Sequence, residues 1–220
     1  MLINGIVAMD KNKGIGKNNN IPWTLRRDLK RFQNLTTGNR NNAIVVGRNT
    51  WNSIKFLKER DHLVLSKTLK LDYQQDGKII KSFSGIQELL TFLKGKNYDK
   101  VWIIGGSEIY KIFLDMSLID ELYVTLIHDS YTCDTHFPGI PGNYFMIQNQ
   151  LQEEVTENGK QTSMVIFKKI KEGMKVSHNY NTYTVVNIHY DDAPNFYFTI
   201  KDKNGNEKQT VKSKIQLKLV

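Results

Sequence analysis

The sequence is poor in cysteine and histidine, and this limits the kinds of site that it can hold. Its one cysteine, Cys133, cannot form a disulfide within the chain, and a lone thiol suits a reducing compartment. Its five histidines are scattered and show, with this cysteine, no metal-ligand spacing. We therefore expect neither a disulfide framework nor a metal centre.

Long apolar runs are also absent. No stretch approaches the roughly 18 apolar residues that a membrane-spanning helix needs. Residues 1–10 contain a short apolar run without the basic start of a signal peptide, and they read as a β-strand. The sequence therefore predicts a cytoplasmic protein with no membrane partner.

The positive charge is spread along the chain instead of being gathered in one block. The formal net charge is +9, of which residues 171–220 contribute +3. Such a surface attracts a small anionic ligand as readily as it attracts nucleic acid. Because no basic block marks a binding face, we do not expect a nucleic-acid partner.

Strand and helix signals alternate through the first ~165 residues, as in an α/β domain. The chain has 220 residues with ordinary apolar and charged content, which fits one domain with a small appendage. Thr24 is the expected N-cap of the first helix. Strands are expected over 2–9, 43–46, 63–65, 79–81, 100–104, 121–127 and 161–169, and helices over 24–35, 84–94 and 107–114, with a short helix after 47–50.

The composition changes near residues 170–173, beyond which no apolar helical periodicity remains. Short alternating runs follow at 183–188, 195–200 and 209–219, separated by turn signals at 191–194 and 203–206. The second turn contains the Asn-Gly pair typical of hairpins. We expect one domain over residues 1–169 and a small all-β domain, such as an SH3-like barrel, over residues 170–220.

An acidic residue opens the first predicted helix. Asp28 follows Ile21-Pro22-Trp23 and precedes Leu29 and Phe32 on an apolar helix face. One interpretation is a carboxylate that merely complements the helix dipole. The other is a carboxylate at the rim of an apolar pocket, where it can pair with the N–H and amino groups of a planar ligand through two hydrogen bonds.

Two glycine turns join strands to helices, and a third glycine segment forms a loop. Val45–Trp51 and Ile103–Tyr110 each place glycine before a helix N-terminus, where backbone N–H groups can hold phosphate. Neither matches the Rossmann pattern G-x-G-x-x-G. Gly14–Asn20 has the composition of a loop that closes over a ligand. Each feature alone is equally compatible with an ordinary turn or connector.

Together and in this order, these segments resemble the dihydrofolate reductase family over roughly residues 1–169. The resemblance implies a mostly parallel, eight-stranded α/β sheet flanked by helices. The matching residues are Ile15-Gly16, Ile21-Pro22-Trp23, Asp28-Leu29 with Phe32, Val46 to Trp51 with Ser53-Ile54, Ile104 to Tyr110, and Asp134-Thr135-His136-Phe137-Pro138.

The resemblance also implies a substrate site. Asp28 would bind the pterin of dihydrofolate and favour protonation of N5, while hydride passes from nicotinamide C4 to pterin C6. Trp23 would help to order a water, and Arg60 would pair with the glutamate α-carboxylate. The other implied substrate-binding residues are Ile6, Ala8, Leu29, Phe32, Ile54, Leu57, Ile104, Tyr110 and Thr125.

The implied cofactor is NADPH, because basic and hydroxyl side chains stand where the family holds the adenosine 2′-phosphate. This group comprises Arg48, Ser66, Lys67 and Lys81. Thr50 and the segment Gly105–Ile109 would hold the pyrophosphate. The implied cofactor-binding residues are Ala8, Ile15, Gly16, Asn20, Gly47, Arg48, Asn49, Thr50, Leu65, Ser66, Lys67, Lys81, Gly105, Gly106, Ser107, Glu108 and Ile109.

One position departs from the family pattern. Familiar bacterial members often have glycine where this chain has Cys133, next to the matching Asp134. A bulkier residue there changes the fit of the Gly16–Asn20 loop. Cys133 is not expected to be a nucleophile, because no adjacent base is evident.

Two further interpretations stay open. One is a reductase of a pyrimidine intermediate in riboflavin synthesis, which the combination of Trp23, Asp28 and Arg60 disfavours. The other is a reductase domain with a structural role, whose tail binds a protein partner. Tail aromatic residues would form either that binding face or the core of the small domain; they are Tyr180, Tyr183, Tyr190, Phe196, Tyr197 and Phe198.

Overall fold

The computed structural model describes residues 1–147, 152–155, 159–190 and 196–218. Contacts divide the chain into two units, of which the first comprises residues 1–138 and 150–166 and the second comprises residues 139–149 and 167–220. One strand contributes residues to both units, so the domain boundary expected after residue 169 stays a prediction.

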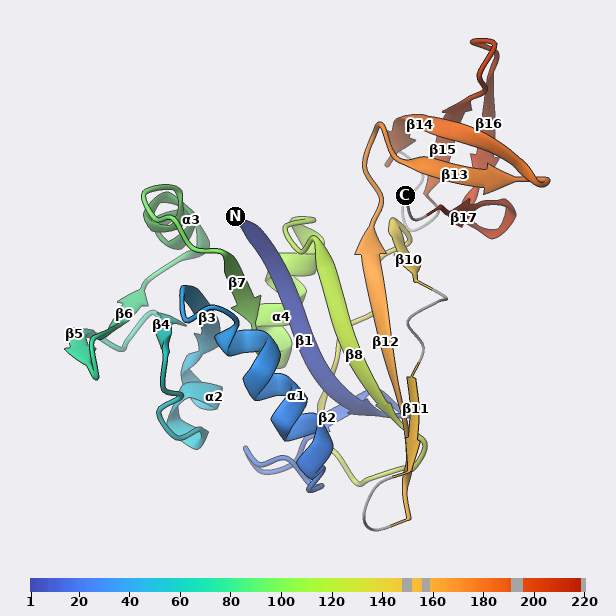
Figure 1. Ribbon diagram of the computed structural model, residues 1–220. Helices are drawn as coiled ribbons and strands as arrows, with labels where there is room; N and C mark the ends of the chain where they lie inside the picture. The colour runs from blue at the N-terminus through green and yellow to red at the C-terminus, as the bar shows by residue number, and fades with distance from the viewer. Residues whose placement is uncertain (148–151, 156–158, 191–195, 219–220) are drawn as a thin grey trace. The chain divides into compact units, whose positions relative to one another are not determined.

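The first unit is built around a mostly parallel sheet (Figure 1). Strand β1 (Leu2–Asp10) lies in its middle and pairs in parallel with β7 (Lys100–Ile103) and β8 (Glu121–Ile127). From β7 the sheet continues through β3 (Asn42–Gly47), β4 (Arg60–Leu65), β6 (Lys78–Phe83) and β5 (Asp72–Gln75), and from β8 through β12 (Gln161–Lys169) to β11 (Gln152–Val155).

Burial explains why the central strands could be predicted. Every residue of β3 is buried, and its sequence is a nearly continuous apolar run. Parallel strands covered on both faces need such runs, because neither face meets water. The predicted strands at 2–9, 43–46, 63–65, 79–81, 100–104, 121–127 and 161–169 all lie within observed strands, apart from the last residue of the fifth.

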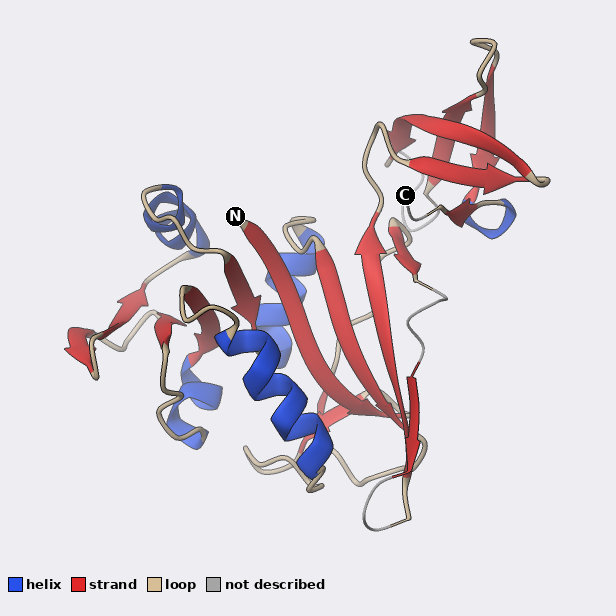
Figure 2. Ribbon diagram, viewed as in Figure 1, coloured by secondary structure: helices blue, strands red, loops and turns tan. Residues whose placement is uncertain are grey.

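Four helices accompany this sheet in the part of the chain that the structure describes: α1 (Arg26–Thr37), α2 (Arg48–Ser53), α3 (Ile86–Lys94) and α4 (Ser107–Asp115). Figure 2 shows α1 and α4 on opposite faces of the sheet. The predicted N-cap of α1 is wrong. Leu25, not Thr24, occupies the cap without a side-chain bond, because its side chain is buried at the start of the helix.

The strand count expected from the resemblance is also wrong. The main sheet has ten strands among the described residues, not eight. One added strand, β5, is exposed along its whole length, and its sequence Asp-Tyr-Gln-Gln lacks apolar alternation. A separate antiparallel pair joins β2 (Gly14–Gly16) to β9 (Thr135–His136).

The second unit is all-β. In it, β10 (Tyr144–Met146) pairs antiparallel with the last residues of β12. A five-stranded antiparallel sheet follows, in the order β16-β15-β14-β13-β17. Its strands are β13 (Lys175–His178), β14 (Asn181–His189), β15 (Tyr197–Lys201), β16 (Glu207–Val211) and β17 (Gln216–Leu217), with a 3-10 turn η2 (Lys212–Lys214) before the last.

The expectations for this tail were confirmed in part. The run at 183–188 lies within β14, and the turn at 203–206 joins β15 to β16. Of the run at 195–200, residues 197–200 lie in β15, while Asn195 lies outside the described residues. A single strand over 209–219 is wrong, because the 3-10 turn separates β16 from β17. The turn expected at 191–194 and the residue Leu219 lie outside the described residues.

The second unit has its own core. Seven buried apolar residues form it, and half-buried ones such as Tyr183 and Phe196 pack against them. The core residues are Phe145, Ile170, Val176, Val185, Phe198, Ile200 and Ile215. Of the tail aromatics, Phe198 is therefore a core residue, whereas Tyr180 is fully exposed.

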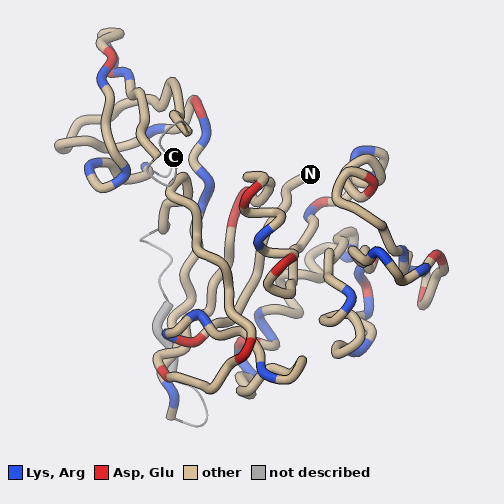
Figure 3. Tube along the Cα trace, turned by 180° about the vertical axis from the view of Figure 1, so that it is seen from behind, with Lys and Arg blue, Asp and Glu red and all other residues tan. Residues whose placement is uncertain are grey.

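Among the described residues, no helix is long and apolar enough to cross a membrane. Figure 3 shows Lys and Arg distributed along the trace and interspersed with Asp and Glu, in agreement with the spread charge of the sequence.

Candidate functional site

The carboxylate of Asp28 lies where α1 faces β8. Asp28 is in the first turn of α1, and its Oδ1 accepts a hydrogen bond of 2.5 Å from the Thr125 hydroxyl on β8. Thr125 is buried, and the Asp28 side chain is 22% exposed. The carboxylate therefore has one oxygen fixed to the sheet while it remains accessible to a ligand.

The carboxyl-terminal half of β1 runs beside this group. Ala8 is in register with Thr125, and Ile6 is in register with Tyr123 on the same neighbouring strand. The Tyr110 hydroxyl of α4 donates to the Ile6 carbonyl oxygen at 2.7 Å. Burial raises the pKa of Tyr110, and the nearby charge of Asp28 raises it further, so this phenol remains a neutral donor.

Trp23 lies before α1 and is half-buried. Its ring is tilted against that of Tyr131, with 5.1 Å between the centroids. The Tyr131 backbone N–H donates to Asp10 at the end of β1. Trp23 is thus tied to the end of the strand that carries Ile6 and Ala8.

The predicted apolar residues come from α1 and from the segment after α2. Leu29 is 54% exposed although it is large and apolar, and Phe32 is half-buried on the same helix. Ile54 and Leu57 are half-buried, and the Leu57 N–H donates to Nε2 of His62 at 3.2 Å. An exposed leucine beside a fixed carboxylate fits a surface that receives a ligand with an apolar part.

Arg60 begins β4 and is only 3% exposed. Its Nη1 donates to the Thr36 hydroxyl at 2.6 Å, and its Nε donates to the Lys58 carbonyl at 3.0 Å. Burial lowers the pKa of the guanidinium, while the charge of Glu59 raises it. Both hydrogen-bond partners are neutral oxygens, so the cation is held in place without a paired carboxylate among these contacts.

The two predicted glycine turns meet in the structure. The Gly47 N–H donates to the Gly105 carbonyl at 2.8 Å, and the peptide between Gly105 and Gly106 is cis. A Cβ on Gly47 would lie 2.9 Å from the Ile109 side chain, and one on Gly106 would lie 3.2 Å from the Thr50 hydroxyl. A side chain at Gly47 would therefore overlap Ile109, and one at Gly106 would crowd Thr50.

The helix N-termini at these turns have no side-chain cap. Gly106 is the N-cap of α4, and Gly47 is that of α2. At α4, the first turn thus offers backbone N–H groups to an anion. Ser107, the first residue of α4, instead directs its hydroxyl to the His136 carbonyl at 2.6 Å.

Of the residues predicted to hold the 2′-phosphate, Arg48 follows β3, Ser66 and Lys67 follow β4, and Lys81 lies within β6. Arg48 donates to the Thr68 hydroxyl at 2.9 Å, and the Ser66 hydroxyl accepts the Thr68 and Leu69 backbone N–H groups. Lys67 is exposed. Lys81 on β6 forms an ion pair with Asp72 on β5, so its charge is already compensated.

Two segments of the predicted loop are held to a distant part of the chain. Gly14 and Gly16 in β2 pair with β9, while Ile15 between them is half-buried. The Asn18 N–H donates to Asp134 at 2.7 Å, and this bond holds the pKa of Asp134 below its usual range. Asn20 is exposed and closes the turn through its bonds with Lys17.

Cys133 packs against this loop. A Cβ on Gly14 would lie 2.5 Å from its Sγ. Burial and the charge of Asp10 raise the pKa of the thiol, which disfavours the reactive thiolate. Both observations fit a packing role. No cluster of metal ligands was found among the described residues.

Sequence reasoning missed two residues of this region. Asp10 is buried, and its carboxylate accepts N–H groups from Asn12, Gly14 and Tyr131, so it holds the turn after β1 to the segment that precedes Cys133. The sequence signal for Asp10 was an acid at the end of a strand, directly before a Lys-Asn-Lys-Gly turn.

Arg31 is the second missed residue, and it lies 3.7 Å from the Asp28 carboxylate. The sequence signal was the spacing of three residues, which brings two side chains together on one face of a helix.

The family model described as dihydrofolate reductase matches residues 2–170 of this chain. The chain is 42% identical over 149 residues to the viral dihydrofolate reductase of Saimiriine herpesvirus 2 (strain 488), covering 64% of this chain and 70% of that protein. It is 38% identical to the dihydrofolate reductase of Gallus gallus, covering 63% and 78%. It is 34% identical over 181 residues to that of Mus musculus, covering 76% and 97%. The chain belongs to the dihydrofolate reductase family.

Proposed function

We propose that this protein reduces 7,8-dihydrofolate to 5,6,7,8-tetrahydrofolate with NADPH. The observation that carries the proposal is the accessible Asp28 carboxylate, which Thr125 fixes beside β1. The resemblance gives this residue the role of the family's substrate-binding carboxylate. The other protein groups that the proposal needs come from β1, α1, α4 and the glycine turns, from β4 and the segments on either side of it, and from β6. Trp23 lies just before α1.

Asp28 binds the pterin through its N3–H and 2-amino groups and favours protonation at N5. A carboxylate paired with two N–H donors fixes both the position and the orientation of a planar ring. The fixed carbonyl of Ile6 and the neighbouring backbone of Ala8 and Ile104 complete the contacts. Trp23 helps to order the water through which the proton arrives.

The p-aminobenzoyl glutamate part of the substrate lies along α1. Leu29, Phe32, Ile54 and Leu57 cover its ring. Arg60 pairs with the α-carboxylate, and its contacts with Thr36 and Lys58 support this role because they hold the guanidinium without neutralising it. A buried cation whose partners are neutral gains most from an anionic ligand.

The residues present fit NADPH. The two glycines at the α4 turn leave open backbone where a Cβ would meet Thr50 or Tyr110, so a pyrophosphate can approach the uncapped N-terminus. Arg48, Ser66 and Lys67 hold the 2′-phosphate, and Thr68 keeps Arg48 in place. Lys81 contributes less, because Asp72 already pairs with it. When bound, NADPH supplies the hydride.

The test is a comparison of substrates with purified protein. We expect oxidation of NADPH with dihydrofolate, and much slower oxidation of NADH, because NADH lacks the phosphate that Arg48 binds. The Arg48→Gln variant should narrow the preference for NADPH while leaving turnover with NADH unchanged. Turnover with a riboflavin-pathway pyrimidine in place of dihydrofolate would overturn the folate assignment.

The tail supports a second role, in binding a protein partner. Tyr180 is 102% exposed at the tip of the β13–β14 hairpin, and Tyr190 is also exposed, whereas the tail aromatics Tyr183, Phe196 and Phe198 belong to the core or pack against it. The meander of β13 to β16, with β17 returning to β13 after a 3-10 turn, supports an SH3-like barrel. The lone thiol of Cys133 fits a cytoplasmic location.

A further inference from the structure

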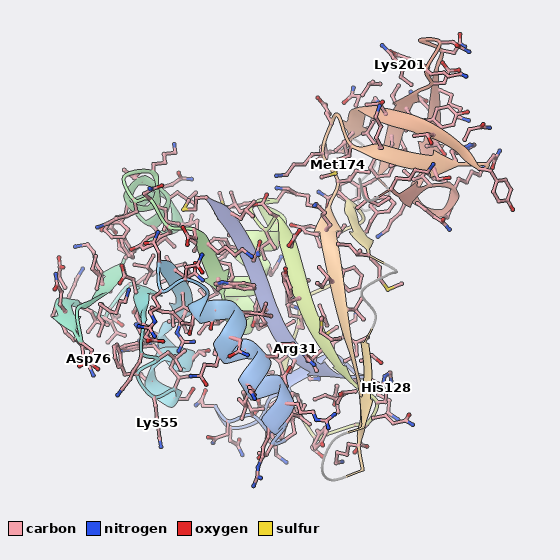
Figure 4. The ribbon with its side chains drawn as sticks, viewed as in Figure 1. Arg31, Lys55, Asp76, His128, Met174 and Lys201 are labelled. Carbon is pink, nitrogen blue, oxygen red and sulfur yellow. The ribbon has the colours of Figure 1, made fainter. Side chains whose placement is uncertain are left out.

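Arg31 lies one turn after Asp28 on α1, and the two side chains face each other. The Nη1 of Arg31 is 3.7 Å from Oδ1 of Asp28. Figure 4 labels Arg31 on this helix. The Arg31 side chain is 18% exposed and the Asp28 side chain is 22% exposed, so protein covers most of both charged groups.

This coverage separates the pair from an ordinary surface ion pair. Two charges three residues apart on an exposed helix interact weakly, because water and salt screen them. Opposite charges at about 4 Å interact several times more strongly at a partly covered site than in bulk water. Arg31 is therefore placed to change the behaviour of the carboxylate.

Two neighbouring groups from other elements are uncharged. From β8, Thr125 offers a hydroxyl that does not titrate, and from α4, Tyr110 is a phenol whose pKa is raised by burial and by Asp28 itself. The contacts with Thr125 and Arg31 both end on Oδ1. The arginine thus acts on the same oxygen that anchors the carboxylate to the sheet.

We propose that Arg31 is a positioning residue that keeps the Asp28 carboxylate ionised and fixes the direction of its Oδ1 atom. The proposal rests on the proposed function, in which Asp28 binds the pterin. In this arrangement the carboxylate meets its ligand already charged and oriented. The protein consequently retains a charged site to a lower pH than it would without the arginine.

The test compares three variants of the full chain. Arg31→Gln removes the charge and keeps a polar side chain of similar length, and Arg31→Lys retains the charge. Lys30→Gln is the matched control, because Lys30 is exposed and points to the other side of α1. Two readouts are followed: the carboxyl titration of Asp28 by carbon NMR without ligand, and the pH profile of kcat/KM with dihydrofolate.

We expect Arg31→Gln to raise the pH midpoint of the Asp28 titration by about half a unit or more, as losing a nearby opposite charge requires. The pH profile should move in the same direction. Arg31→Lys should retain most of the wild-type behaviour, and Lys30→Gln should leave both curves in place.

The proposal would be overturned if the Asp28 carboxyl titration curves of the wild type and Arg31→Gln coincided. A shift as large in Arg31→Lys as in Arg31→Gln would also overturn it, because charge would then not be the cause. If the carboxyl titration shifts as expected but the wild type does not reduce dihydrofolate, the proposed function fails while the role of Arg31 toward Asp28 stands.

Discussion

At the scale of single residues, His62 is a closely packed titratable group outside the carboxylate site. It is fully buried on β4, stacked on Phe56 and edge-on to Trp51. Burial and the charge of Arg60 lower its pKa to about 4. The neutral ring accepts the Leu57 N–H, which ties the segment before Arg60 to the sheet.

We predict that His62 makes the protein less stable as the pH falls from about 6.5 to about 4. In this window the unfolded state binds a proton that the native imidazole does not, so the free energy of unfolding falls by up to about 3 kcal/mol. Urea denaturation at several pH values should show this loss in the wild type and a smaller one in His62→Asn. Equal slopes in the two proteins would contradict the prediction.

The site residues differ in how far a sequence can predict them. Asp28 was predictable because its place in a helix, after Pro-Trp and before apolar residues, is local information. The role of Arg31 was not, because its effect depends on how much of the pair the sheet covers. Arg60 was expected as a ligand, but its bonds to Thr36 and Lys58 follow only from the meeting of α1 with β4.

At the scale of elements, the close packing of β2 against the segment before β9 fixes the loop. Gly14 has no room for a side chain, because Cys133 fills the space next to it. The two positions are therefore coupled. A glycine in one of them permits a larger residue in the other.

We predict that Gly14→Ala destabilises the protein by about 1–3 kcal/mol, the usual cost of overpacking. The added methyl group would lie 2.7 Å from the Cβ of Cys133, so Cys133→Ala should not relieve it. Cys133→Gly in the same chain should restore most of the loss. Denaturation midpoints of the single and double variants measure the coupling, and additive effects would argue against it.

The β13–β14 hairpin carries a strained residue at its tip. Its two loop residues, Asn179 and Tyr180, have φ of 48° and 66°, which corresponds to a type I′ turn. Asparagine tolerates this conformation, whereas tyrosine does not favour it. The ring of Tyr180 gains no compensating burial.

We predict that Tyr180→Gly stabilises this hairpin by about 1 kcal/mol, because glycine adopts a positive φ without steric cost. Slower hydrogen exchange of the Val176 and Val185 amides would support the prediction. If Tyr180 contacts a protein partner, Tyr180→Gly should weaken binding of that partner while it stabilises the hairpin. Faster exchange in the variant would contradict the account of the turn.

Elements with apolar periodicity were predictable, and those without it were not. Apolar runs in the sequence predict the buried strands β1, β3 and β8. Strand β5 is polar and exposed, and it forms because it pairs with β6. The cap of α1 was missed because burial of Leu25 outweighs the capping preference of Thr24.

At the scale of the whole molecule, the second unit draws its core from two stretches of sequence. Phe145 lies before β12, yet its ring contacts Phe198 at 5.7 Å between centroids, and Lys212 lies over its face. Together they cover Phe145, leaving it 5% exposed. The tail is thus not a simple addition after residue 169.

We predict that a chain ending at residue 169 is less soluble than the full chain, because it exposes Phe145. Exposure of this ring alone removes about 2 kcal/mol of hydrophobic stabilisation. Phe145→Lys in the shortened chain should restore solubility. Size-exclusion chromatography of the two shortened proteins measures this. A shortened chain that is monomeric with Phe145 intact would show that the tail does not protect that residue.

The measurement that most directly tests the central claim is reductase activity of the Asp28→Asn variant beside the wild type. The variant keeps a hydrogen-bonding side chain of the same size but loses the charge. We predict that turnover of dihydrofolate falls at least about 100-fold, the scale for losing a group that directs a proton, while NADPH binding is unchanged. A folded variant with wild-type turnover would contradict the account.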